Sequence, residues 1–342
     1  MRIILAAAIT LLGMGQVGSR VYAQDSTGSA ARMVQRAVVE RELSALADDS
    51  MQGRMTGTPG AARSARYIAE EMAAIGLIPA GDSGYFQRVP VGRLEGSGQL
   101  ILEEHLAPGA AGALDRVPAV NVVGIIRGGD PVLGDSAVLV DAHYDHLGIG
   151  RPVHGDSIYN GADDDGSGTV AVLEIARAMR AGPTPRRTVI FLTTIGEEVG
   201  LLGTRWFVSH PVVPLDRIEA NLEIEMIGRP DSLAGGPGRG WLTGFDRSTM
   251  GEMFARAGLP IVPDRRPSQN FFMRSDNIAF ARRGIPAHTL SSFALHTDYH
   301  EPSDELSRID FAHMTELIDA AARAVRLLAD GPAPHWNPGG RP

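Results

Sequence analysis

The sequence of 342 residues contains neither lysine nor cysteine. All 32 basic residues are arginine, which excludes catalysis by a Schiff-base lysine, a P-loop lysine or a serine–lysine pair. The absence of cysteine excludes a thiol nucleophile, disulfide bonds and metal sites built from thiolates. Any nucleophile must therefore be a hydroxyl group, a carboxylate or an activated water molecule.

Positive charge is also scarce relative to negative charge. The formal net charge is −8 at pH 7, and the arginines form no basic block. Nucleic-acid-binding proteins concentrate basic residues on one face, so we expect no nucleic-acid partner. Hydrophobic residues make up 44% of the chain and charged residues 21%, which is ordinary for a globular protein.

The first residues have the pattern of a signal peptide. Arg2 precedes an apolar run over residues 3–12, which is shorter than the ~20 residues that span a bilayer. Residues 21–23 end in Ala23, a small residue suited to a signal-peptidase site. We therefore predict cleavage after Ala23 and a secreted or periplasmic mature chain without a membrane anchor. The alternative is a buried N-terminal helix.

Strand and helix patterns alternate through the rest of the chain. Predicted strands cover residues 85–91, 99–103, 119–126, 137–142, 188–194, 218–226, 241–244 and 285–290. Predicted helices cover residues 32–47, 61–75, 167–179, 201–209, 249–257, 276–282 and 310–329. This alternation predicts an α/β fold with helices on both faces of one mixed sheet. No linker divides it, so we predict a single domain over residues 24–330 and a disordered, Pro/Gly-rich tail over residues 331–342.

Five polar clusters follow or end these strands. They are Asp141-Ala-His143-Tyr-Asp145-His146, Gly161-Ala-Asp163-Asp164-Asp165-Gly-Ser-Gly168, Gly196-Glu197-Glu198-Val-Gly200, Glu223-Ile-Glu225-Met-Ile-Gly228 and His296-Thr-Asp298-Tyr299-His300. Sites in open α/β sheets form beyond the carboxyl ends of strands, so the clusters can converge there. Imidazole and carboxylate ligands without thiolate suit zinc or a similar ion.

Each cluster alone also has an ordinary structural interpretation. A single histidine after a strand is usually a loop or core residue, an Asp triplet is usually a solvated turn, and a Glu pair usually lies on the surface. Glu225 is the exception, because it lies among Ile224, Met226 and Ile227, where an ionised carboxylate needs a partner or a metal. The occurrence of all five clusters at strand ends favours a metal site.

The order of these motifs resembles the M28 family of co-catalytic zinc exopeptidases. The resemblance extends upstream to residues 52–60 and downstream to Ser275-Asp276 and residues 284–286, and it covers nearly all of residues 40–328. It implies a three-layer α/β/α sandwich with a mixed, mostly parallel central sheet, which agrees with the alternation of strands and helices.

The resemblance also implies two zinc ions per chain and a role for each motif residue. His143 and Glu225 would bind one zinc ion, Glu198 and His300 the other, and Asp164 would bridge both. Asp145 would orient the ring of His143 from outside the ligand set. Glu197 would be the general base acting on the metal-bound water, and Tyr299 would donate a hydrogen bond to the tetrahedral oxyanion.

Some assignments have competitors within the same motifs. His146 competes with His143, and the family pattern favours His143. His296 competes with His300, and the preceding Tyr299 favours His300. Asp163 and Asp165 are expected to shape the turn that presents Asp164. Glu at position 225 departs from the family, in which Asp is commoner, and the longer side chain puts the fine geometry of that metal in doubt.

The implied function is an aminopeptidase that hydrolyses N-terminal residues from peptides. Three alternatives stay open: a glutaminyl-cyclase-like acyltransferase with one catalytic zinc, a carboxypeptidase of the same family, and a binding protein with an inactive site. We expect the substrate pocket to be walled by residues 229–238 and 260–272 and by the region of Phe293. The sequence indicates neither the preferred side chain nor the oligomeric state.

Overall fold

The computed structural model describes residues 34–106 and 114–342, all of which belong to one compact unit. The predicted signal peptide over residues 1–23 lies outside the described residues. In the part of the chain that is described, no helix is both long and apolar enough to cross a membrane.

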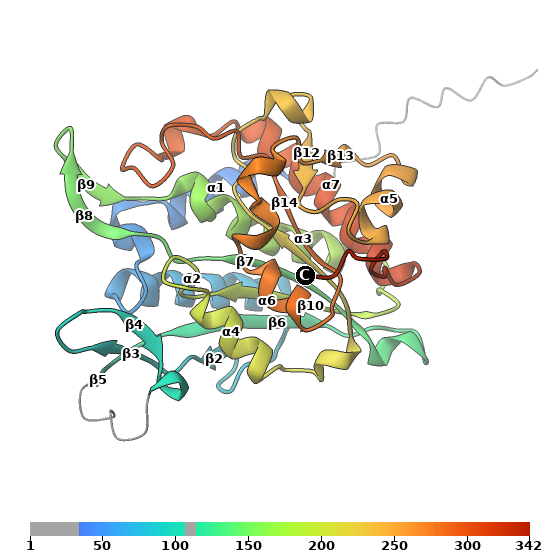
Figure 1. Ribbon diagram of the computed structural model, residues 1–342, viewed down its shortest axis with the longest axis horizontal. Coiled ribbons are helices and arrows are strands. Elements are labelled where there is room, and N and C mark those ends of the chain that lie inside the picture. Colours follow the sequence, from blue (N-terminus) through green and yellow to red (C-terminus); the bar gives the residue numbers. More distant parts are fainter. Residues whose placement is uncertain (1–33, 107–113) are drawn as a thin grey trace, which may run out of the picture. The chain divides into compact units, whose positions relative to one another are not determined.

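A mixed sheet of nine strands forms the middle of the fold (Figure 1). Its strands are β1 (Ile78–Pro79), β2 (Phe86–Arg88), β6 (Val120–Ile126), β7 (Ala137–His143), β10 (Thr188–Thr194), β11 (Ile218–Ile224), β12 (Gly240–Leu242), β13 (Ile261–Pro263) and β14 (Ala287–Ser291). The strand order is β1-β6-β10-β7-β11-β14-β12-β13, with β2 also paired to β6. The four central strands β10, β7, β11 and β14 are parallel, whereas β6 and β12 join them antiparallel.

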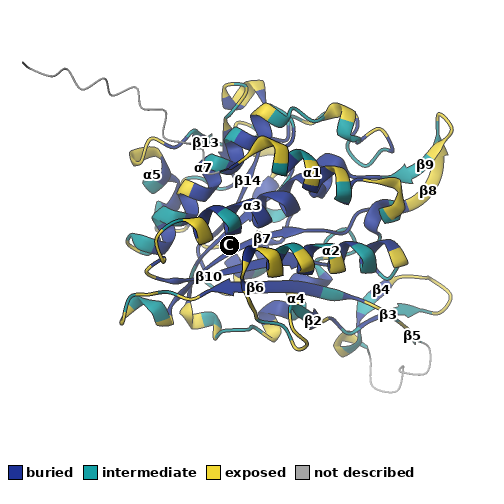
Figure 2. Cartoon of the chain, turned by 180° about the vertical axis from the view of Figure 1, so that it is seen from behind, coloured by how far each residue is buried: buried dark blue, intermediate teal, exposed yellow. Residues whose placement is uncertain are grey.

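Helices cover both faces of this sheet (Figures 1 and 2). One face carries α1 (Arg36–Leu46), α2 (Pro59–Ile75), α3 (Gly168–Ala181) and α7 (Phe311–Asp330), and the other carries α4 (Leu202–Ser209) and α6 (Asn277–Arg282). The short helix α5 (Thr249–Arg256) packs beside β13. The predicted three-layer sandwich with a parallel centre is therefore confirmed.

The central strands are apolar on both sides because each side faces helices. In β7, Val138 and Val140 join the core under α1, α2, α3 and α7, whereas Leu139 joins the core that contains Phe207 of α4 and Phe280 of α6. Successive side chains of a strand point to opposite faces, so a strand covered on both faces is a continuous apolar run. This is why the buried strands were visible in the sequence.

The ends of α2 show how local sequence sets element boundaries. The hydroxyl of Thr58 accepts a hydrogen bond from the backbone of Ala61, and Pro59 occupies the first turn, where its missing N–H has no cost. Gly76 ends the helix in the left-handed region with φ of 82°, as predicted from its position after the apolar pattern.

Two smaller sheets lie outside the main one. Strands β3 (Val91–Leu94), β4 (Leu100–Leu102) and β5 (Leu114–Val117) form an antiparallel sheet in the order β4-β3-β5. Strands β8 (Gly148–Val153) and β9 (Asp156–Tyr159) form a hairpin. The hairpin was not predicted, because two glycines and a proline interrupt β8 and neither strand is a continuous apolar run or a regular alternation.

The prediction that residues 331–342 are disordered is wrong in this structure. Trp336 forms a β-bridge with Ser248, and its indole N–H donates to the carbonyl oxygen of Gly284 at 2.8 Å. Its ring also lies 5.7 Å from that of His288 and 6.4 Å from that of Phe272, centroid to centroid. The Pro/Gly-rich composition hides this segment from periodicity arguments, but one aromatic side chain is enough to dock it.

We predict that Trp336→Ala lowers the free energy of unfolding by about 1–3 kcal/mol, because it removes a half-buried ring and its hydrogen bond. Urea unfolding followed by circular dichroism measures the change. Pro338→Ala, at an exposed position of the same segment, serves as the control. Equal stability of the Trp336 variant and the wild type would show that the segment is not docked.

Candidate metal centre and active site

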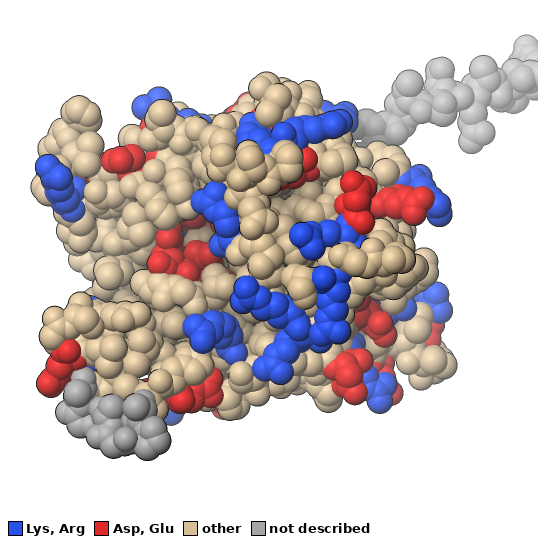
Figure 3. All heavy atoms as spheres, in the orientation of Figure 1, with Lys and Arg blue, Asp and Glu red and all other residues tan. Residues whose placement is uncertain are grey.

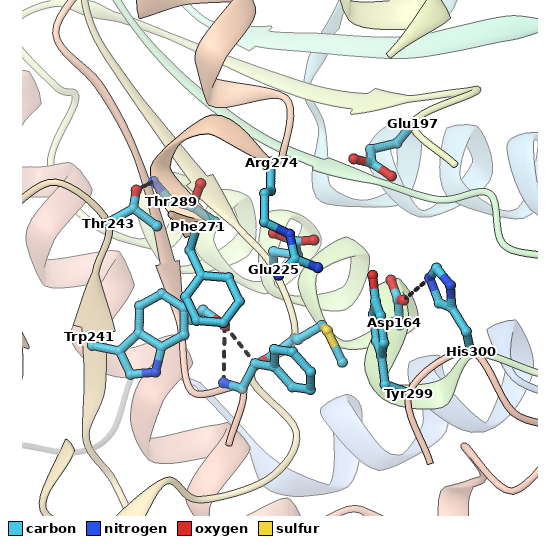
Figure 4. Close-up of a pocket in the computed structure, with 13 residues that line it drawn as sticks. Asp164, Glu197, Glu225, Trp241, Thr243, Phe271, Arg274, Thr289, Tyr299 and His300 are labelled. Atoms are coloured by element: carbon cyan, nitrogen blue, oxygen red, sulfur yellow. Dashed lines mark hydrogen bonds and ion pairs between the residues drawn. The ribbon is translucent and has the colours of Figure 1, made fainter. Parts of the chain in front are cut away.

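The candidate site lies where the four parallel strands end. His143 is the last residue of β7, Glu197 and Glu198 follow β10, and Glu225 follows β11. His300 comes from the loop after β14. Because β10, β7, β11 and β14 are parallel neighbours, their carboxyl ends lie at one edge of the sheet, and the loops that follow converge there (Figure 4).

A first group of possible metal ligands consists of His143, Asp164 and Glu225. One donor atom from each lies within 4.8 Å of the others. Nε2 of His143 is 3.3 Å from Oδ1 of Asp164, although the two atoms do not form a hydrogen bond of good geometry. Nδ1 of His143 lies 3.1 Å from the carbonyl oxygen of Asp145, to which it can donate. Because Nδ1 then carries the proton, the lone pair of Nε2 is free to bind a metal.

The second group contains Asp164 and Glu198 with His146, and one donor atom from each lies within 4.8 Å of the others. His300 lies beside this group. Nε2 of His300 lies 3.2 Å from Oδ2 of Asp164 and 3.2 Å from Oε2 of Glu198. Asp164 therefore faces His143 with one oxygen and His300 with the other, as a bridging carboxylate would. The structure brings together all five side chains for which the sequence predicted metal binding.

His146 also belongs to this second group, although the sequence argument set it aside. Its Nδ1 lies 2.8 Å from Oε1 of Glu198 and 3.8 Å from Oδ2 of Asp164, and its side chain is fully buried. It does not belong to the group of His143, but it competes with His300 as the histidine of the second group. The adjacent histidine in the motif was visible in the sequence, yet only the turn after β7 determines which group it faces.

Asp164 is presented by a turn that its neighbours fix. The carboxylate of Asp163 accepts from the backbone of Gly228 at 2.7 Å, and that of Asp165 accepts from the backbone of Met226 at 3.0 Å. The carboxylate of Asp304 accepts from the backbone N–H groups of both Asp163 and Asp164. The expectation that Asp163 and Asp165 shape this turn agrees with these contacts.

His296 takes part in the same turn. Its Nε2 lies 3.1 Å from Oδ2 of Asp163, and so the structure places it outside both ligand groups. This arrangement agrees with the preference for His300 as the metal ligand of that motif.

A buried arginine joins the loops that bear these ligands. The guanidinium of Arg54 donates to the carbonyl oxygens of Tyr144, Asn160, Gly161 and Leu46 at 2.5–3.0 Å. It thereby links the segment after His143 to the segment before Asp164. Burial lowers its pKa, which Asp304 and Asp164 counteract, and arginine stays charged under such conditions. The sequence argument noted the loop of Arg54 but gave this residue no role.

Asp145 contacts the ring of His143 through its carbonyl oxygen, and its carboxylate has other partners. Its carboxylate lies 3.8 Å from Nδ1 of His143, which is too far for a hydrogen bond. Its carbonyl oxygen lies 3.1 Å from the same nitrogen, within hydrogen-bonding distance. The carboxylate accepts from the hydroxyl of Thr56 at 3.0 Å and from the backbone of Glu197 at 3.2 Å. Asp145 therefore connects His143 with the segment that holds Glu197.

The electrostatics of the site are dominated by buried negative charge. Burial raises the pKa of Glu225 well above its ordinary value, and the charge of Glu223 raises it further. Burial likewise raises the pKa of Glu197, against the effect of His143. Burial opposes charging of His143, yet its carboxylate neighbours raise its pKa well above the ordinary value. These carboxylates can therefore stay ionised only if cations lie close to them, and protonated histidines supply only part of that positive charge.

The residues present fit divalent metal ions of the zinc type. The donor set is imidazole nitrogen and carboxylate oxygen, as zinc prefers. Nε2 of His143 and Oδ1 of Asp164 are buried and lack a hydrogen-bond partner among the described residues, which buried polar atoms rarely do. Both observations are explained if these atoms bind metal.

A pocket with one aromatic wall and otherwise mostly polar lining opens beside the ligands (Figure 4). Trp241, Phe271 and Phe293 form its aromatic wall, and the rings of Trp241 and Phe271 stack with centroids 5.1 Å apart. Tyr299 also lines it and stacks on His300 at 3.9 Å. Burial raises the pKa of Tyr299, so its hydroxyl group remains protonated.

The predicted pocket walls were correct only in part. Phe271 and Phe293 line the pocket as expected, whereas residues 229–238 do not. Their place is taken by strands β12 and β14, which contribute Trp241 and Thr289 among others, and by Arg274. The antiparallel pairing of β12 with β14 brings these residues to the site, and that pairing had no local signal in the sequence.

The curated relatives of this chain include the following two enzymes. Leupeptin-inactivating enzyme 1 from Streptomyces exfoliatus is 28% identical over 264 residues, which cover 70% of this chain and 54% of that protein. Aminopeptidase YwaD from Bacillus subtilis is 27% identical over 188 residues, which cover 47% of this chain and 41% of that protein. The chain thus spans about half, or less, of the length of these relatives.

Solved structures share the fold. A zinc aminopeptidase from Bacillus subtilis, BSAP, superposes with a TM-score of 0.65 at 18% identity, covering 87% of this chain and 96% of that one. Glutaminyl cyclase from Porphyromonas gingivalis superposes with a TM-score of 0.61 at 15% identity, covering 86% and 99%. The sequence model of peptidase family M28 matches residues 121–325, which is more than half of the chain. This protein therefore belongs to peptidase family M28.

Proposed function

We propose that this protein is an aminopeptidase that binds two zinc ions and releases N-terminal residues from peptides. The observation on which the proposal depends is that Asp164 is shared by two possible ligand groups, one with His143 and Glu225 and one with His146 and Glu198. Nε2 of His300 also lies 3.2 Å from Asp164 and from Glu198, and Glu197 lines the adjoining pocket. His143, Asp164 and Glu225 would bind one ion, and Asp164, Glu198 and His300 the other. When bound, the zinc ions would lower the pKa of a water molecule and polarise the peptide carbonyl group.

Glu197 is the proposed general base. Its carboxylate lines the pocket and makes no hydrogen bond within the described part of the chain, so it is free to accept a proton. Its backbone N–H is fixed by Asp145, the residue whose carbonyl oxygen also orients His143. The base and the ligand are therefore positioned by a single residue. Glu197 would take a proton from the attacking water and later give it to the leaving amine.

Tyr299 is the proposed donor to the tetrahedral oxyanion. It keeps its proton because burial and the nearby carboxylates raise its pKa. Its ring is fixed between His300, at 3.9 Å, and Phe293, at 5.1 Å. A donor that is already oriented stabilises developing negative charge without reorganisation during the reaction.

The alternative functions are less well supported. Similarity to a glutaminyl cyclase concerns the fold alone, and the chain provides ligands for two ions rather than one. An inactive binding protein would not need Glu197 directed into the pocket beside both ligand groups. The geometry does not orient a bound peptide, and so the distinction from a carboxypeptidase needs an experiment.

The location of the enzyme is a separate proposal. The signal-peptide pattern of residues 1–23 leads us to propose export to the periplasm or the medium. N-terminal sequencing of the protein recovered outside the cytoplasm would establish whether cleavage follows Ala23.

We predict that acetylation of a peptide's N-terminus suppresses cleavage, whereas amidation of its C-terminus does not. The physical reason is that an exopeptidase recognises the charged end next to the bond that it cuts, so neutralising that end removes a required contact. Product analysis by mass spectrometry on matched peptides measures this. The reverse pattern would identify a carboxypeptidase.

We predict about two zinc ions per chain, with activity lost on chelation and restored by added zinc. Histidine must be neutral and carboxylates ionised to bind metal, so zinc affinity falls as the pH is lowered. Metal analysis of the purified protein, with a chelator competition at several pH values, measures both effects. An active enzyme free of metal would refute the proposal, and one zinc ion with cyclase activity would favour the acyltransferase.

We predict that Glu197→Gln and Glu198→Gln fail in different ways. The first variant keeps the shape of the side chain but loses the basic oxygen, so kcat should fall by at least ~10² while KM and bound zinc change little. The second weakens a ligand, so bound zinc should fall and activity should require excess zinc. If Glu197→Gln lost zinc and Glu198→Gln lost only turnover, the two roles would be exchanged.

A further inference from the structure

Arg274 reaches into the candidate active-site pocket. It follows the short helix η9 (Phe271–Met273) and lines the same pocket as Glu197, Glu225 and Tyr299. In the close-up view its guanidinium lies between Phe271 and Tyr299 (Figure 4). Among the residues that line this pocket it is the one arginine, and the proposed mechanism gives it no role.

The guanidinium of Arg274 has no acidic partner in the described part of the chain. Two other arginines near the site do have one: Arg229 lies 2.8 Å from Asp298, and Arg266 lies 2.6 Å from Asp231. The guanidinium of Arg274 lies 5.1 Å from the centroid of the Phe271 ring, in a cation–π contact, and its charge acts on Tyr299, but it forms no hydrogen bond or ion pair with the described residues. Its five N–H donors, arranged in a planar fork, are therefore available to a ligand.

The backbone beside Arg274 is fixed, although the tip of the side chain is exposed. The carboxylate of Glu223 accepts from the hydroxyl of Ser275 and from the backbone N–H groups of Asp276, at 3.0 Å, and Asn277, at 2.8 Å. On the other side, Phe271 is held by its stacking on Trp241. The arginine is thus attached to a rigid segment at a set distance from the ligands, as a specificity residue must be.

We propose that Arg274 binds a carboxylate of the substrate, so that the enzyme prefers peptides with an acidic group next to the scissile bond. Guanidinium and carboxylate form paired hydrogen bonds of matched geometry. The other charged groups of the pocket include Asp164, Glu197 and Glu225, whose charge bound zinc would offset, so Arg274 remains the cationic side chain that a substrate carboxylate can meet. Figure 3 shows acidic atoms in a hollow of the molecular surface with arginine side chains around it. This inference rests on the proposed aminopeptidase function.

The carboxylate can come from two places in a short peptide. One is the side chain of an N-terminal Asp or Glu residue. The other is the α-carboxylate of a dipeptide, which lies one residue beyond the scissile bond. Both sources present a carboxylate to Arg274, and substrates that contain only one of the two distinguish between them.

The test compares kcat/KM for two matched substrate pairs. Glutamyl- and glutaminyl-aminomethylcoumarin differ only in the charge of the side chain, and Leu-Gly and its amide differ only in the terminal carboxylate. The variants are Arg274→Gln, which loses the charge, and Arg274→Lys, which keeps the charge but loses the fork. Arg283→Gln is the control, because Arg283 is exposed after α6 and does not line the pocket. Bound zinc is measured in every sample.

In the wild type we expect the charged member of at least one pair to be the better substrate. Arg274→Gln should lower kcat/KM for that member by about 10- to 100-fold, the range for a lost hydrogen bond to a charged group, and change its neutral partner by less than about two-fold. Arg274→Lys should give a smaller loss, and Arg283→Gln none. An effect on the glutamyl pair alone assigns the side chain, and an effect on the dipeptide pair alone assigns the α-carboxylate.

Three results would overturn the inference. They are no preference for a charged substrate in the wild type, an equal loss for both members of a pair in Arg274→Gln, and an equal loss in Arg283→Gln. If the wild type cleaved the neutral substrates without preference, the inference would fail and the proposed function would stand. If it cleaved none of the four substrates, both would fail. Should Arg274→Gln not fold, Arg274→Lys and competitive inhibition by L-glutamate against L-glutamine give the same decision.

Discussion

The constraint on which this structure depends is the concentration of buried carboxylates at the carboxyl edge of the sheet. Those that are fully or nearly buried are Asp141, Asp145, Asp163, Asp164, Asp165, Glu223, Asp276 and Asp304, and Glu197, Glu198 and Glu225 lie beside them. An ionised carboxylate inside a protein is costly unless hydrogen bonds or cations compensate it. The loops around the site supply hydrogen bonds to most of these groups, whereas Glu197 and Glu225 obtain none from the described residues.

Two sets of carboxylates can be distinguished by the partner they have. Asp163, Asp165, Asp304 and Glu223 accept hydrogen bonds from backbone N–H groups and hydroxyls, and they bind the loops to one another. Asp164, Glu198 and Glu225 face histidines or lack partners, which leaves lone pairs for metal ions. The first set orients the second, because Asp164 lies between two members of it in the sequence. A ligand set held this firmly needs little reorganisation when metal binds.

Much of this could be predicted from the sequence, for identifiable reasons. The strands covered on both faces are continuous apolar runs, so β7, β10 and β11 were found within two residues of their ends. Parallel strands place their carboxyl ends together, and so motifs distant in sequence could be combined into one site. The contacts that depend on long-range packing could not be predicted. His146 contacts Glu198, which is 52 positions away in the sequence, and Arg54 contacts Asn160 at about twice that sequence separation. The docking of Trp336 depends on a surface formed by other loops.

The charge of the occupied site bears on which substrates it accepts. Two divalent ions would balance the four charges of Asp164, Glu197, Glu198 and Glu225, so that Arg274 would be the remaining charged side chain among those that line the pocket. A free peptide brings a further positive charge on its α-amino group, and this charge and Arg274 repel each other, although solvent screens an exposed side chain such as Arg274. A substrate carboxylate beside Arg274 removes this repulsion, whereas an N-terminal Lys or Arg side chain increases it. The same metal ions that allow the buried carboxylates to stay ionised thus shift the preference of the pocket toward acidic peptides.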